Sequence, residues 1–162
     1  MPHNPSEKNC SLKGYSRPHC RLANPAGTLE SRLFDHIDLR VRNRARAQEF
    51  FAKILPAIGF TLNKSAEEWG AFEKDGGGKP AEFFGFTEDA NHRPNETRIA
   101  FWAETREQID RVAKIVREAG GQNLEGPQIW PEYSPGYYAL FFEDPDGNKF
   151  EICCRGSAIV AE

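Results

Sequence analysis

Apolar and polar side chains alternate along residues 33–42, which read LFDHIDLRVR. Ile37, Leu39 and Val41 fall on one side of an extended chain, and charged or polar residues fall between them. Alternation with a period of two residues predicts a strand with one buried face. Residues 97–103, TRIAFWA, alternate in the same way and predict a second strand of this kind.

Each of these strands precedes a stretch with helical spacing. The first predicted helix covers residues 44–58, and Pro56 is expected to kink or tighten its last turn. Its apolar positions are Phe50, Phe51, Ile54 and Ile58. The second predicted helix covers residues 106–119, with Thr105 as a candidate N-cap and Gln108 completing a capping box. Its apolar positions are Ile109, Val112, Ala113 and Val116.

Further strands are predicted after each helix. They cover residues 60–64, 68–73, 81–87, 128–133, 137–143 and 149–153. The two halves of the chain align at an offset of 62 residues, so that His36 meets Arg98 and Ile54 meets Val116. Each half therefore reads β-α-β-β-β. We expect an α+β fold in which two such modules form a curved, cup-shaped sheet of eight strands, with the helices on its outer face.

The N-terminal part of the chain has a different composition. Residues 1–32 hold four of the eleven prolines, one aromatic residue and no hydrophobic periodicity. Such a segment buries too little apolar surface to offset the entropy of ordering it. We expect a flexible tail over 1–32, one domain over 33–155 and a short tail over 156–162. Cys10, His19 and Cys20 lack an evident fourth ligand, so no metal clip is expected in the N-terminal tail.

Charge and composition exclude several classes of partner. Lys and Arg number 21 and Asp and Glu number 24, which gives a net charge of −3 and no sign of a basic face for nucleic acid. No apolar run approaches the roughly 18 residues of a membrane span. The N-terminus lacks the pattern of a signal peptide, and the four cysteines show no CxxC spacing. We therefore expect a cytoplasmic protein with reduced thiols and no membrane or nucleic-acid partner.

The face of the predicted sheet that points away from the helices is unusually polar. It carries His36, Asp38, Arg40, Arg98, Trp102 and Glu151. A concave surface with a few convergent polar groups is typical of a small-molecule site. The loops at residues 89–96 and 121–130 are expected to shape its specificity.

The paired modules resemble the vicinal oxygen chelate superfamily, which includes glyoxalases, bleomycin-resistance proteins, fosfomycin-resistance enzymes and extradiol dioxygenases. Three segments carry the resemblance: 34–37 (FDHI), 98–101 (RIAF) and 135–151 (PGYYALFFEDPDGNKFE), the last being the most specific. The resemblance implies a cup that holds one divalent metal (Zn, Ni, Mn or Fe) and performs lyase, isomerase or dioxygenase chemistry. It also implies a homodimer, because a second subunit often completes the cup.

By the same resemblance, the metal ligands would be His36 and Glu151, with Glu132 or His92 completing the set. Glu151 would also be the catalytic carboxylate that moves a proton. The third position commonly held by His is Arg98 here, and a guanidinium has no lone pair to donate. Two protein ligands are too few for an ordinary catalytic metal site.

The alternative is a cup without metal, in which Arg98 pairs with Glu151. Arg98 and Arg40 would then capture an anionic or carbonyl group. Trp102, Tyr138 and Phe84 would stack on an apolar or aromatic ligand. Two functions therefore remain open: a glyoxalase-like protein that binds or transforms a small oxygenated molecule, and a metal-free protein that sequesters a drug or metabolite. Whether the protein is an enzyme stays open with them.

Overall fold

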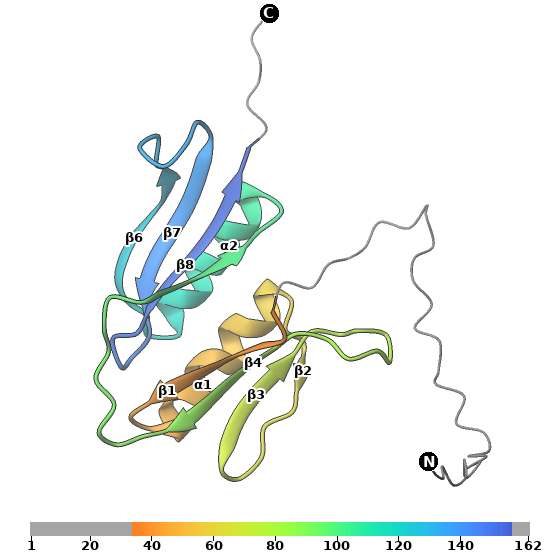
Figure 1. Cartoon of the computed structure of the whole chain (residues 1–162). Helices are drawn as coiled ribbons and strands as arrows, with labels where there is room; N and C mark the ends of the chain where they lie inside the picture. Colours follow the sequence, from red (N-terminus) through yellow and green to blue (C-terminus); the bar gives the residue numbers. More distant parts are fainter. Residues whose placement is uncertain (1–33, 157–162) are drawn as a thin grey trace, which may run out of the picture. The chain divides into compact units, whose positions relative to one another are not determined.

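The computed structural model describes residues 34–156 (Figure 1). Residues 1–33 and 157–162 lie outside the described part. The expected N-terminal tail, with Cys10, His19 and Cys20, therefore lies outside it, as does all of the expected C-terminal tail except Gly156.

The first module begins with β1 (His36–Val41) and α1 (Arg44–Ile54), which a 3-10 turn, η1 (Leu55–Ile58), continues. It ends with β2 (Leu62–Asn63), β3 (Trp69–Glu73) and β4 (Phe83–Glu88). The strands form a sheet in the order β1-β4-β3-β2, with β1 parallel to β4. Pro56 lies in η1, where the helix tightens as predicted, because proline has no N–H for a continuing α-helical bond.

The second module repeats this arrangement. Its elements are β5 (Arg98–Trp102), α2 (Arg106–Glu118), β6 (Gln122–Ile129), β7 (Tyr137–Glu143) and β8 (Lys149–Arg155), and the strand order is β5-β8-β7-β6. The Thr105 hydroxyl caps α2 by accepting the N–H of Gln108 at 3.2 Å. The Gln108 side chain accepts from the N–H of Glu104, one residue before the expected partner in a capping box.

The expected fold class is confirmed, with its paired β-α-β-β-β modules and, within residues 34–156, eight strands. The strands are divided into two hydrogen-bonded sheets of four. None of the helices within residues 34–156 is long and apolar enough to cross a membrane.

The strand predicted at residues 128–133 lies elsewhere. β6 covers Gln122–Ile129, within a segment that we expected to be a loop, and residues 131–133 form a turn. Two register irregularities interrupt its pairing with β7, and Asn123 and Gly126 have positive φ values of 48° and 90°. A bulged strand at the edge of a sheet does not keep a period of two residues, so the hydrophobic pattern did not reveal it.

One hydrophobic core lies between the helices and the sheets of both modules. Phe51 of α1 is 2% exposed and packs against Phe84 and Phe86 of β4, with ring centroids 5.2 and 5.1 Å apart. The same ring meets Phe150 of β8 at 5.7 Å. Because a single side chain contacts both sheets, burial of apolar surface holds the two modules together.

The turn between β7 and β8, residues 144–148, adds polar contacts between the modules. Asp146 is 4% exposed and accepts hydrogen bonds from the backbone N–H of Arg42, at 2.6 Å, and from the guanidinium of Arg46. Asn148 donates to the carbonyl of Arg40 and to the carboxylate of Asp144. The turn of the second module therefore satisfies backbone groups at the end of β1, in the first module.

The Asp146→Ala variant tests this connection. It leaves the part-buried N–H of Arg42 without its acceptor and removes the ion pairs of Asp146 with Arg42 and Arg46, so we expect the free energy of unfolding to fall by about 2 kcal/mol. Urea unfolding at pH 7 measures the change. The matched control is Glu96→Ala, which removes an exposed carboxylate that pairs with Lys149 at 2.6 Å, and its loss should be much smaller. Equal losses in the two variants would contradict a role for the turn in joining the modules.

Candidate functional site

Residues of β7 alternate between two separate apolar clusters. Leu140 and Phe142 join the core beneath the helices, whereas Tyr137, Ala139 and Phe141 belong to a cluster on the opposite face of the sheet. On that face four aromatic rings, the aromatic cluster, pack together: Trp130, Tyr133, Tyr137 and Phe141. Ring centroids are 5.0 Å apart for Trp130 and Phe141 and 5.3 Å apart for Tyr133 and Tyr137. Tyr133 is 57% exposed, so this cluster reaches the solvent.

A buried carboxylate lies beside the aromatic cluster. Glu151 of β8 is 7% exposed, and the Tyr137 hydroxyl donates a hydrogen bond to it. Burial, followed by the neighbouring Cys153 and Glu151, raises the pKa of Tyr137 well above its ordinary value. Burial likewise raises the pKa of the Cys153 thiol. A phenol and a thiol are protonated at neutral pH even at their ordinary pKa values, and these shifts move ionisation to still higher pH. The phenol is therefore a donor to Glu151.

Arg98 lies on the same face but does not pair with Glu151. Its guanidinium carbon is 4.6 Å from the centroid of the Phe141 ring, a cation–π contact. In the register of β5 and β8, Arg98 is opposite Lys149, and Ala100 is opposite Glu151. Within residues 34–156 no ion pair joins Arg98 to Glu151, so this expectation was wrong. Instead, Tyr137 is the hydrogen-bond partner of Glu151.

Two residues expected to stack on a ligand face the helices instead. Phe84 is fully buried in the core and packs against Phe51 and Phe101. The Tyr138 hydroxyl donates to Asp110 of α2 at 2.7 Å. The structure therefore corrects both assignments. The adjacent residues, Phe83 and Tyr137, occupy the faces that the helices leave open, because neighbouring residues of a strand point in opposite directions.

Trp102 lies at the end of β5, on the same face as Arg98 with Ala100 between them, and is 55% exposed. Trp130, Tyr133 and Phe141 were not singled out from the sequence. The sequence could have identified Phe141, because it falls on the same alternating face of the strand as Tyr137 and is paired with Glu151 across β7 and β8. Trp130 and Tyr133 border a turn, where hydrophobic alternation gives no information.

The open face of the first sheet carries a different group of side chains. The imidazole of His36 stacks on Phe83, with centroids 4.5 Å apart and an interplanar angle of 11°, and its Nδ1 is 3.0 Å from the Asp35 carboxylate. A hollow of about 230 Å³ lies here, lined by His36, Asp38, Trp69, Phe83, Gly85 and Thr87. Arg40 donates to Asp38 at 2.7 Å, so its guanidinium is already paired.

The expected metal ligands do not form a metal site. His36 belongs to the first sheet and Glu151 to the second, and each interacts with residues of its own module. Glu132 is exposed in the turn after β6, and His92 is hydrogen-bonded to Asn148 at 2.7 Å. In the described part of the chain no three His, Cys, Asp or Glu side chains gather to hold an ion. With Arg98 at the remaining position, these donors do not fit a divalent metal.

The family of the protein follows from a comparison with family models. Residues 33–152 match the model of the Glyoxalase/Bleomycin resistance protein/Dioxygenase superfamily. The chain therefore belongs to this superfamily, as its paired modules and its segment 135–151 suggested. Among curated proteins, none matches the sequence significantly.

Solved structures share the fold at low sequence identity. A glyoxalase/bleomycin resistance protein from Albidiferax ferrireducens T118 is 23% identical, with a TM-score of 0.64 over 77% of this chain and 100% of that one. The fosfomycin resistance protein FosX from Mesorhizobium loti is 18% identical, with a TM-score of 0.55 over 79% of this chain and 94% of that one. FosX from Listeria monocytogenes is 17% identical, with a TM-score of 0.57 over 77% and 93%. At these identities the likeness shows the fold alone.

Proposed function

We propose that the protein binds a small oxygenated aromatic molecule on the aromatic cluster, without a divalent metal. The observation that carries the proposal is the position of Arg98, a permanent cation held over Phe141 where a metal ligand would be needed. Glu151 supports it, because its carboxylate accepts the hydrogen bond of Tyr137. A guanidinium here also repels a divalent ion.

The residues around the cluster suggest how such a ligand would be held. A planar ring would stack on Trp130 and Tyr133, whose apolar faces supply most of the contact area. Arg98 would donate to a carbonyl, phenolate or carboxylate oxygen of the ligand, because a guanidinium presents several N–H groups in one plane. Trp102 would extend the stacking surface along β5. Binding without turnover is the sequestering function known from bleomycin-resistance proteins of this fold.

A homodimer in the cytoplasm is the proposed form of the protein. Large apolar side chains on both sheets are exposed, with Trp69 at 40% and Trp102 at 55%, and such surfaces favour a protein contact. Buried free thiols at Cys153 and Cys154 suit a reducing compartment. The net charge of −3 argues against a nucleic-acid partner. Sedimentation equilibrium tests the dimer, and a monomer at all concentrations would contradict it.

Calorimetric titration with 1-hydroxy-2-naphthoate in the presence of EDTA tests the binding function. We expect saturable binding that quenches tryptophan fluorescence, with the quenching much reduced in Trp130→Phe and kept in Trp69→Phe. Arg98→Met should weaken binding about tenfold, because it removes a charge-assisted hydrogen bond.

The matched control is Arg106→Met. Arg106 lies over the Tyr138 ring at 5.3 Å, on the helix side of the sheet, so its loss should leave the affinity nearly unchanged. Binding that requires an added divalent metal would overturn the proposal, as would equal losses in the two arginine variants or no saturable binding at all.

A further inference from the structure

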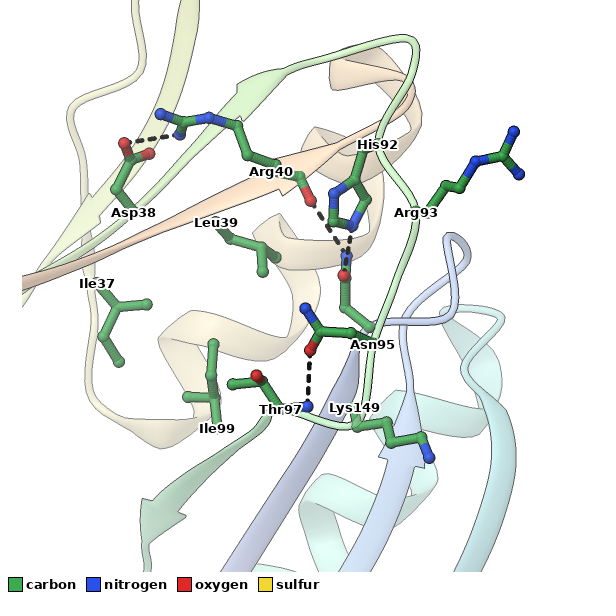
Figure 2. A pocket seen from close by; sticks show the side chains of 11 residues that line it. Ile37, Asp38, Leu39, Arg40, His92, Arg93, Asn95, Thr97, Ile99 and Lys149 are labelled. Atoms are coloured by element: carbon green, nitrogen blue, oxygen red, sulfur yellow. Dashed lines mark hydrogen bonds and ion pairs between the residues drawn. The ribbon is translucent and has the colours of Figure 1, made fainter.

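Another hollow, larger than the one beside His36, lies between the two modules (Figure 2). It shares no residue with the aromatic cluster. Its volume is about 480 Å³, within the range of small-molecule sites. The walls come from β1, from the loop that leads into β5, from β5 itself and from the turn before β8.

The floor of this hollow is aliphatic. Ile37 and Leu39 of β1 are directed toward Ile99 of β5 (Figure 2), and all three are half-buried. β1 and β5 are edge strands of different sheets and are not hydrogen-bonded to each other, so a gap remains between their side chains. No aromatic side chain other than the His92 imidazole lines the hollow, so it suits an alkyl chain better than a planar ring.

A smaller hollow adjoins it and is basic. Its volume is about 310 Å³, and it is lined by Arg42, Ala90, Asn91, His92, Arg93 and Pro94, with no acidic residue among them. The two hollows share His92 and Arg93, so one ligand can contact both. An anionic head group would be favoured in the basic hollow, and an alkyl chain over the aliphatic floor.

Arg93 is the cation available to such a head group. Arg40 is paired with Asp38, Lys149 with Glu96, and Arg42 with Asp146. Among the described residues Arg93 has no acidic partner, and Figure 2 shows its side chain extending from the loop away from the aliphatic floor. The loop is held by His92, which contacts the buried Asn148 at 2.7 Å, and by Asn95, which accepts from the N–H of Thr97. Little ordering of the backbone is therefore needed on binding.

We propose that the hollow between the modules and the adjoining basic hollow together bind a medium-chain alkyl anion. Its alkyl chain would lie between Ile37, Leu39 and Ile99, and its head group at Arg93. This site is separate from the aromatic cluster and does not depend on the function proposed there.

Calorimetry with octanoate and octyl phosphate tests the site, and the two probes distinguish a carboxylate from a phosphate head group. At least one should bind saturably below its micellar concentration, about tenfold tighter than octanol. Affinity should rise roughly fourfold for each methylene added between hexanoate and octanoate. Octylammonium binding as tightly as the anions would overturn the proposal, and so would octanol binding equally well.

Two variants locate the head group. Arg93→Glu should weaken the anionic probe about tenfold, and it replaces an exposed side chain, so the fold should be kept. Lys79→Glu makes the same change of charge in the exposed turn between β3 and β4 and should leave the affinity unchanged. Equal effects of the two variants would show a non-specific charge effect and overturn the site.

Methyl NMR locates the alkyl chain of the bound probe. The anionic probe should shift the methyl signals of Ile37, Leu39 and Ile99 and leave the indole N–H of Trp130 in place. Shifts confined to Trp130 and its neighbours would place the probe on the aromatic cluster and contradict the second site.

Discussion

The shared aromatic core beneath the helices determines which side of every strand is free to bind a ligand. Phe51 packs against rings from both β4 and β8, so both sheets turn the same set of alternating positions toward α1 and α2. The side chains at the remaining positions form the open faces of the sheets. They include His36 and Phe83 on the first sheet and Tyr137 and Glu151 on the second. Phe84 and Tyr138 occupy positions that face the helices, so their side chains are not part of the open faces.

Burial of Glu151 then determines the hydrogen bonding on the open face of the second sheet. A carboxylate that is 7% exposed needs hydrogen-bond donors, and the Tyr137 hydroxyl supplies one. Arg98 does not donate to Glu151, because its guanidinium lies over Phe141. It cannot coordinate a metal, because a guanidinium has no lone pair to give. The result is an aromatic surface with two cations, Arg98 over Phe141 and Arg155 over Tyr137, and one hydrogen-bonded carboxylate, which supports the proposed recognition of an oxygenated ring.

The sequence predicted the fold well and the site only in part. Alternation at Ile37, Leu39 and Val41 and helical spacing in both helices report which faces are buried, and the repeat of the pattern predicted two modules. Adjacent aromatic pairs were ambiguous, because hydrophobicity does not tell which member of Phe83–Phe84 faces the core. The cation–π contact of Arg98 was also missed, since the reach of a long side chain depends on neighbours brought close only by folding. The position of β6 was not predicted, because its bulges interrupt the two-residue alternation of apolar and polar side chains.

On the function proposed above, Arg98 and the Tyr137–Glu151 hydrogen bond leave no place for a divalent metal. Calorimetric titration of the full chain with Ni²⁺, Zn²⁺ and Mn²⁺ tests it most directly. We expect no binding of one ion per chain that depends on His36 and Glu151. Stoichiometric binding that is abolished by His36→Ala and by Glu151→Gln would contradict it.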